Sequence, residues 1–209
     1  MLYKRINQQK ANILIRKNLF IACLSLSFCI KANAQSLQNT NKLFWSENHR
    51  LTISDFKGIP AKDDTVLQNV SPNLWTHKLS AITKSIDVSL NTEKNKTTFT
   101  IRAGMLPEFS WIKDPGDTIE LKHEQGHFDI CEIYARMLRR DIKKALTLDE
   151  AKSIYEKIST EEETEQDVYD LVNTFQAGGI TTDWKEKIVS RLEALKAFKN
   201  PVIILPFDH

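Results

Sequence analysis

The residues His123-Glu124-Gln125-Gly126-His127 combine types and spacing that could bind one metal ion and activate water. Histidines at positions i and i+4 project from the same face of a helix, one turn apart, so both imidazoles can reach one ion. Neutral imidazole suits Zn²⁺, which is therefore the predicted cofactor. Glu124 follows the first ligand and can reach a water at the metal, where we expect it to act as general base.

The surroundings of this HExxH motif favour a functional interpretation. HExxH arises by chance in about one in a hundred chains of this length, and the alternative is two ordinary histidines on a helix face. The motif lies inside a long helical pattern. Gly126 is costly in a helix interior, so we expect another group to approach the metal-binding face closely at that position.

A catalytic zinc usually takes three protein ligands, and two histidines leave one to be found. No third histidine follows at the metzincin spacing, so we expect a carboxylate. The helix with the motif and the next helix meet near residues 146–147 and should form an antiparallel hairpin. That hairpin brings Glu165, Asp167 and Asp170 opposite the two histidines.

The helical phase of the second helix ranks these carboxylates. If Val168, Val172 and Phe175 form its inner face, Glu165 flanks that face and Asp170 points away from it. The alternative for the acidic run is a solvated helix surface. From the residues alone, the third ligand stays open.

The elements that position the motif predict an α+β fold with an antiparallel sheet in the N-terminal half. Alternating apolar residues on both sides of a turn-rich segment at 91–96 predict a β-hairpin. A short strand-like element lies near 51–56. The expected helices are 118–145, 147–175 and 182 to about 200, followed by a short strand at 202–205.

Local signals support the ends of these helices. The first two helices each begin with a capping box, Asp117 with Glu120 and Thr147 with Glu150. The pair Gly178-Gly179 is expected to end the second helix.

The N-terminus has the pattern of a signal peptide. Six basic and no acidic residues occur in the first 34, an apolar run extends from Leu19 to Ile30, and small residues precede Gln35. We expect cleavage near Ala34-Gln35 and an extracytoplasmic location, periplasmic or secreted. An uncleaved membrane anchor is the alternative. The expected divisions are a signal peptide at 1–34, a flexible leader at 35–42 and a single domain at 43–209.

Charge excludes one class of partner. The chain has 29 Lys and Arg residues against 27 Asp and Glu residues, a net charge of +2. Without the first 34 residues, 23 basic residues face 27 acidic ones, so the basic footprint of a nucleic-acid-binding protein is missing. No second apolar stretch is long enough to span a bilayer, so we expect no stable membrane insertion after signal cleavage. The oligomeric state is not indicated.

The run HEQGHFDICEIYARMLRR, from His123 to Arg140, resembles a bacterial uncharacterised-domain family of predicted secreted zinc-dependent proteases, whose motif reads HEQxHFDIxExxAR. The resemblance implies a zincin-like fold of the gluzincin type, zinc ligands at His123 and His127, and a catalytic Glu124. Further matches are the segment from Trp45 to Pro60, Phe109-Ser110-Trp111, Tyr169-Asp170 and Trp184.

The resemblance also favours Asp170 over Glu165 as the third ligand, against the helical phase. The predicted ligand set is therefore His123, His127 and Asp170. One departure from the family pattern bears on activity: the family often continues YDxxTxHG, and Phe175 stands here where that histidine would be.

Together these observations predict an exported zinc-dependent metallohydrolase, most simply a peptidase, with a peptide or protein as its substrate. An exposed hairpin edge could align an extended peptide by β-augmentation. A non-catalytic envelope or binding protein on a zincin scaffold is the alternative that Phe175 motivates. A metal-free helical domain is a third.

Other polar residues have simpler expected roles. Glu132 is expected to pair with Arg136 at i+4, and Asp129 to orient a ligand imidazole or to act locally on its helix. Cys131, alone after signal cleavage, is expected to be a buried small apolar residue. Core packing is expected for Tyr134, Tyr155 and Tyr169, and isolated surface or structural roles for His49, His77 and His209.

Overall fold

The computed structural model describes residues 41–60, 80–94, 96–173 and 178–206. They belong to a compact unit, Asn41–His209, whereas the preceding unit, Met1–Thr40, lies outside the described residues. The expected signal peptide and nearly all of the leader therefore fall outside the described part, as do His77, Phe175 and His209.

The main sheet is built around a long antiparallel hairpin. Strand β3, Lys84–Glu93, pairs along its length with β4, Lys96–Met105. The other edge of β4 pairs with two short strands, β1 (Leu43–Phe44) and β6 (Val202–Leu205). A second, small sheet joins β2 (Ser80–Ala81) to β5 (Trp111–Ile112). Three short 3-10 helices are η1 (Ile53–Asp55), η2 (Pro107–Phe109) and η3 (Lys196–Phe198).

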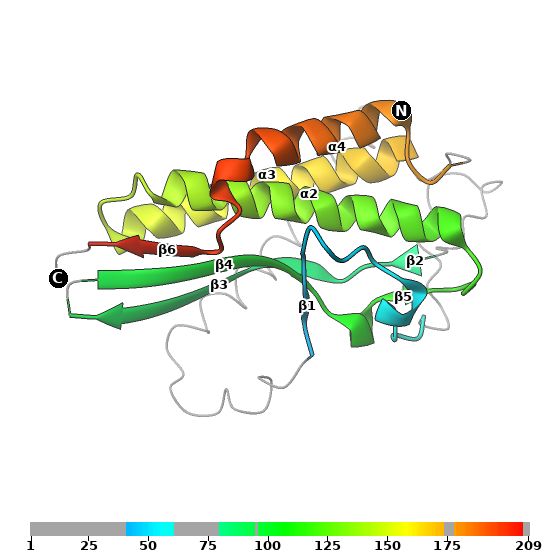
Figure 1. The fold of residues 1–209 in the computed structure, drawn as a ribbon, viewed down its shortest axis with the longest axis horizontal. Coiled ribbons are helices and arrows are strands. Elements are labelled where there is room, and N and C mark those ends of the chain that lie inside the picture. Colours follow the sequence, from blue (N-terminus) through cyan, green and yellow to red (C-terminus); the bar gives the residue numbers. More distant parts are fainter. Residues whose placement is uncertain (1–40, 61–79, 95, 174–177, 207–209) are drawn as a thin grey trace, which may run out of the picture. The chain divides into compact units, whose positions relative to one another are not determined.

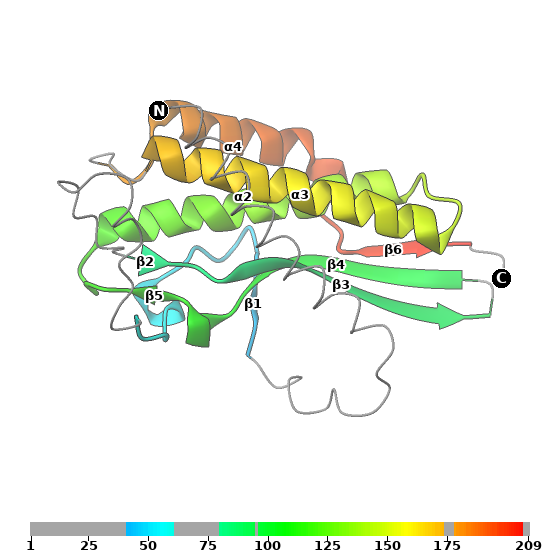
Figure 2. The same ribbon diagram turned by 180° about the vertical axis from the view of Figure 1, so that it is seen from behind.

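In the described part of the chain, three α-helices lie between β5 and β6: α2 (Thr118–Ile142), α3 (Leu148–Asn173) and α4 (Thr182–Ala194). Figures 1 and 2 show α2 between the sheet and the pair α3 and α4. Alternate residues of β4 from Thr97 to Met105 are buried, as expected for a strand with one face against a helix. The central position of α2 explains why residues on nearly all its sides are buried.

The expected α+β class with antiparallel sheets is confirmed, with some differences in its elements. Residues 53–55 form a 3-10 turn rather than a strand. The Asp55 carboxylate caps this turn by accepting hydrogen bonds from the backbone N–H and the hydroxyl of Thr52. The hairpin strands extend to the pair Glu93 and Lys96, so the turn is shorter than expected. None of the helices in the described ranges combines the length and the apolar character needed to cross a bilayer.

The start of α2 is capped as expected, but not by a reciprocal box. The Asp117 side chain accepts hydrogen bonds from the backbone N–H groups of Ile119 and Glu120. The carboxylate of Glu120 instead accepts from the Ser80 hydroxyl, at 2.6 Å. The cap residue thus sets the helix start, while Glu120 ties that end of α2 to β2.

A buried charged cluster joins α2 to its neighbours. Glu132 accepts from Arg136 Nε at 2.9 Å, as expected, and also from the Arg139 guanidinium at 2.9 and 3.2 Å. Both arginines donate further to backbone carbonyls, Arg136 to Leu192 and Arg139 to Ile101. One carboxylate therefore organises contacts from α2 to both α4 and β4.

A second polar cluster holds the segment after β1 against α2. Asp129 accepts from Trp45 Nε1 at 2.8 Å, from Arg50 at 2.8 and 3.1 Å, and from Gln125 Nε2 at 2.8 Å. Gln125 in turn accepts from the Leu51 backbone N–H. Asp129 therefore anchors this segment to α2. Of its two expected roles, the local one is found in the bond to Gln125 on the same helix, whereas none of its hydrogen bonds to described residues involves an imidazole.

Candidate metal centre

The two motif histidines of α2 meet Asp170 of α3. Asp170 Oδ1 lies 3.1 Å from His123 Nε2 and 2.9 Å from His127 Nε2, and the two Nε2 atoms are 3.1 Å apart. The imidazoles are buried, whereas the Asp170 side chain is 55% exposed. The group could hold a metal ion, and its open side faces solvent through Asp170.

The outer nitrogen of His123 has a defined partner. Its Nδ1 lies 3.1 Å from the backbone carbonyl oxygen of Gly179. A carbonyl oxygen only accepts hydrogen bonds, so Nδ1 carries the proton and Nε2 of a neutral imidazole presents a lone pair. Gly179 has φ +74°, and a Cβ there would lie 3.0 Å from the carbonyl carbon of Ile119 and closer still to its oxygen. Glycine is therefore required where the chain brings this carbonyl to His123.

The outer nitrogen of His127 is held by a side-chain amide. Gln166 Oε1 lies 2.5 Å from His127 Nδ1, and Gln166 Nε2 donates to the His127 carbonyl and to Glu162 Oε1. The two partners of Gln166 Nε2, the His127 carbonyl and the Glu162 carboxylate, only accept hydrogen bonds. The amide nitrogen must therefore face them, and the amide oxygen faces the imidazole. When its imidazole is neutral, His127 therefore also has its proton on Nδ1 and a lone pair on Nε2.

His123 Nε2, His127 Nε2 and Asp170 Oδ1 thus converge. When both imidazoles are neutral, all three atoms are acceptors and no proton lies between them. Zinc ligands at 2.0–2.2 Å in tetrahedral geometry lie about 3.4 Å from one another. The observed separations of 2.9–3.1 Å need to open by only a few tenths of an ångström to admit an ion. Two imidazole nitrogens and one carboxylate oxygen leave a fourth position open, as in catalytic zinc sites. The residues present fit zinc.

The close approach of these groups shifts the pKa values of His123 and Asp170. Burial lowers the pKa of His123, but the hydrogen bond to Asp170 and the charges of Glu124 and Asp170 outweigh it, so the net pKa is raised. Burial raises the pKa of Asp170, but hydrogen bonds to His123 and His127 outweigh that effect and hold it below its usual range. The site therefore favours a negative carboxylate facing positive charge, whether protons or a metal supply it.

The helical-phase argument against Asp170 was wrong. Val168 and Val172 are substantially exposed, and the buried positions of the second half of α3 are polar. These inward residues are Glu162, Gln166, Tyr169 and Asn173. Because the inner face is polar, the apolar residues identified the wrong side of the helix, and Asp170 lies beside the true inner face, four residues after Gln166.

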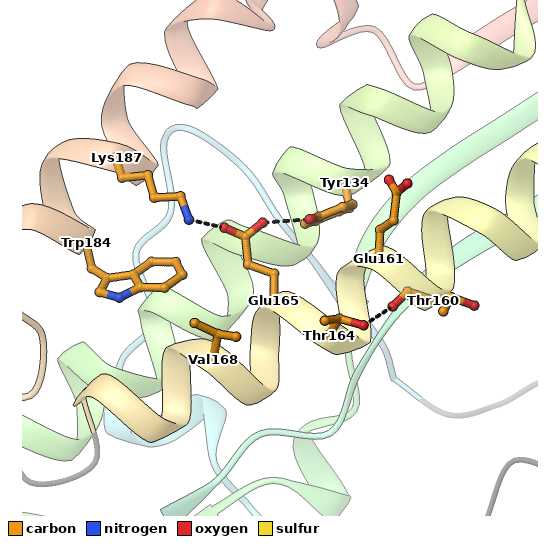
Figure 3. Close-up of a pocket in the computed structure, with 8 residues that line it drawn as sticks. All are labelled: Tyr134, Thr160, Glu161, Thr164, Glu165, Val168, Trp184 and Lys187. Atoms are coloured by element: carbon orange, nitrogen blue, oxygen red, sulfur yellow. Dashed lines mark hydrogen bonds and ion pairs between the residues drawn. The ribbon is translucent and has the colours of Figure 1, made fainter. Parts of the chain in front are cut away.

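Glu165, the other candidate ligand, is engaged elsewhere. Its carboxylate lies 2.6 Å from the Tyr134 hydroxyl, 2.6 Å from Lys187 Nζ, and 2.6 and 2.7 Å from Arg191. Figure 3 shows it pointing between Tyr134 and Lys187 in a surface pocket of α2, α3 and α4. Burial raises the pKa of Glu165, but these donors outweigh burial and lower it overall. Glu165 is a structural counter-ion of this pocket.

The motif glycine has the close neighbour that the sequence predicted. A Cβ on Gly126 would lie 2.6 Å from Cζ of the Tyr169 ring and closer still to its hydroxyl oxygen. The Tyr169 hydroxyl donates to the His123 carbonyl at 3.0 Å, and its ring packs against both imidazoles and against Trp184. Gly126 therefore lets Tyr169 pass behind the two histidines and support them.

The replacement Gly126→Ala is expected to lower the free energy of unfolding by about 1–3 kcal/mol, because the fully buried Tyr169 ring cannot move away without strain. Urea unfolding followed by circular dichroism measures this. Gly178→Ala is the matched control, since its Cβ would meet no atom of the described residues nearer than 3.8 Å. Equal costs at the two positions would contradict the packing role of Gly126.

Glu124 is a buried carboxylate next to the first histidine. Its residue is 3% exposed, and it makes no hydrogen bond or ion pair with the residues that the structure describes. Its negative charge acts on both His123 and Tyr169. A buried carboxylate without a partner among the described residues is costly.

The remaining candidate residues lie where local roles explain them. His49 pairs with Asp55 at 3.3 Å, and Cys131 is fully buried, with burial raising its pKa. The hydroxyls of Tyr134 and Tyr169 donate to protein acceptors. Sequence reasoning did not identify Gln166 or Gly179 as contacts of the histidines. A backbone carbonyl carries no sequence signal, although Glu162, Gln166 and Asp170 at four-residue spacing do mark one helix face.

Comparison of the chain with protein-family models, with curated proteins and with solved structures found no match.

Proposed function

We propose that this protein is a zinc-dependent hydrolase that cleaves peptide bonds. The observation that carries the proposal is the convergence of His123 Nε2, His127 Nε2 and Asp170 Oδ1 within 3.1 Å, with both Nδ1 atoms occupied by acceptors. Glu124, buried and without a protein partner among the described residues, supplies the general base that such a site requires.

The chain's own groups have distinct tasks in this reaction. Zinc, when bound, polarises the scissile carbonyl and lowers the pKa of the attacking water. Glu124 accepts a proton as the water oxygen bonds to the carbonyl carbon. It then returns that proton to the leaving nitrogen as the C–N bond breaks, which gives a free carboxylate and a free amine. His123, His127 and Asp170 hold the metal.

A peptide substrate agrees with the edge of the sheet. On its side away from β4, β3 pairs with no strand in the described part of the chain. The start of β3 lies beside α3, since Lys84 Nζ is 2.6 Å from Glu162 Oε1. An extended peptide could add to this edge through backbone hydrogen bonds, near the helix that carries Asp170.

The test is metal content together with cleavage of a pool of unstructured peptides. We expect one zinc per chain, cleavage that chelation removes and added zinc restores, and loss of both in His123→Ala. His49→Ala is the control, because His49 is exposed and its side chain pairs with Asp55, away from the motif histidines in the sequence. Cleavage that continues after zinc is removed would overturn the proposal.

A non-catalytic zinc-binding protein is the second candidate. It is favoured by the tyrosine hydroxyls near the site, since those of Tyr134 and Tyr169 are already donated to Glu165 and to the His123 carbonyl. Neither is free to stabilise an oxyanion in this arrangement. One zinc per chain without cleavage of any peptide, and an unchanged cellular role in Glu124→Gln, would favour this candidate.

A further inference from the structure

A line of buried polar groups extends from the sheet to one of the imidazoles. Lys84 Nζ on β3 donates to Glu162 Oε1 at 2.6 Å, Gln166 Nε2 donates to the same oxygen at 2.6 Å, and Gln166 Oε1 accepts from His127 Nδ1. Gln166 is buried, and the side chains of Lys84 and Glu162 are 15% and 10% exposed. Solvent therefore offers little competition for these bonds.

Which group donates each hydrogen bond in this line follows from Lys84, which can only donate, and from the His127 carbonyl, which can only accept. Lys84 can only donate, so Glu162 is an acceptor toward it and toward Gln166. The Gln166 amide nitrogen has both its protons used, by Glu162 and by the His127 carbonyl. A flipped amide would place its oxygen against two acceptors and its nitrogen against a protonated Nδ1. Only one orientation satisfies all the groups.

From this arrangement we propose that Gln166 is a positioning residue for the metal, held in place by Glu162 and Lys84, which keeps the lone pair of His127 Nε2 directed at the ion. The inference rests on the proposed zinc site and concerns how that site is held. The opposite tautomer of His127 has a proton on Nε2 and cannot bind. An amide fixed against Nδ1–H excludes that tautomer and also fixes the rotation of the ring.

The same chain of contacts explains the polar inner face of α3. Glu162 and Gln166 take core positions where apolar residues would pack at lower desolvation cost. Within the described part of the chain, the hydrogen bonds of these two side chains connect Lys84, Glu162, Gln166 and His127 to one another. The path therefore links the start of the edge strand β3 to a proposed metal ligand.

The test is the zinc affinity of purified variants, measured by competition with a chromophoric chelator. Gln166→Met keeps the length of the side chain and removes its polar atoms, and we expect about 10- to 100-fold weaker zinc binding. Gln125→Met is the matched control. Gln125 is the other bonded glutamine near the motif, but its contacts are the Leu51 N–H and Asp129, not an imidazole. We expect its zinc affinity to stay within about 3-fold of wild type even if its stability falls.

A second variant separates positioning from packing. The double change Glu162→Gln/Gln166→Glu again places an acceptor opposite His127 Nδ1–H and avoids two adjacent carboxylates. We expect it to bind zinc more tightly than Gln166→Met. In ¹⁵N NMR of the zinc-loaded protein, the Nδ1–H proton of His127 should exchange slowly in wild type and in Gln125→Met, and quickly in Gln166→Met.

The outcomes distinguish this inference from the proposed function. If wild type binds no zinc, the proposed function fails together with the inference. If wild type binds zinc and Gln166→Met binds it equally tightly, with an unchanged Nδ1–H signal, the zinc site stands and the positioning role of Gln166 is overturned. A double variant that is no tighter than Gln166→Met would also contradict it.

Discussion

Replacing Glu124 with glutamine is expected to slow peptide hydrolysis by about 10²- to 10⁴-fold while one zinc per chain stays bound. Glutamine has nearly the same shape and cannot accept a proton from water at neutral pH. Glu124 makes no bond to another residue that the structure describes, so its loss breaks no structural contact there. Initial rates with a saturating peptide, together with zinc content from mass spectrometry, measure both effects.

Glu120→Gln is the matched control for this replacement. Glu120 lies one helical turn before Glu124 on α2, and its carboxylate accepts a hydrogen bond from the Ser80 hydroxyl. We expect its hydrolysis rate to remain within about 3-fold of wild type. A Glu124→Gln variant with bound zinc and full activity would remove the general base from the proposed mechanism while leaving the metal site intact.

Glu132→Ala is expected to lower the free energy of unfolding by about 3–5 kcal/mol, because it removes the buried carboxylate that two buried guanidinium groups share. Arg136 and Arg139 are 1% and 2% exposed, so water cannot replace the lost partner without opening the core. Arg136 would keep only the half-exposed Glu47, and the bonds of Arg139 to backbone carbonyls would leave its charge without a carboxylate among the described residues. Denaturant unfolding with matched m-values measures this loss.

The control for Glu132 is Glu163→Ala, an exposed position on α3, where the change should fall within about 0.5 kcal/mol. A loss below 1 kcal/mol for Glu132→Ala would mean that water or rearranged side chains satisfy the two arginines. We expect the replacement to affect stability alone, because the hydrogen bonds of Glu132 are with Arg136 and Arg139 and not with either imidazole.

The sequence predicted the features that depend on neighbours along the chain. The caps at Asp117 and Thr147, the alternation in β4 and the short strand β6 all follow from local spacing and local hydrogen bonds. The need for space at Gly126 also followed from one costly residue, although its neighbour Tyr169 could not be named. Such signals depend on residues within one or two turns, so they can be read from the chain itself.

Features of the site that depend on distant partners could not be read in the same way. The inner face of α3 was assigned from its valines, but Gln166 and Glu162 are buried because His127 and Lys84 lie opposite them. The choice of Asp170 came from a resemblance and not from the physical argument, which pointed to Glu165. Hydrophobic patterning fails where a helix buries polar groups that bond to one another.

The position of the three converging atoms has a thermodynamic consequence for the whole helical layer. His127 and Asp170 are 43 residues apart in sequence and belong to different helices. A bound ion would therefore close a long loop and act as a cross-link, which for a covalent bridge of this span removes about 4 kcal/mol of unfolded-state entropy. Since the facing surfaces of α2 and α3 are rich in polar groups here, zinc supply would govern the folding equilibrium of this hairpin as well as any chemistry it performs.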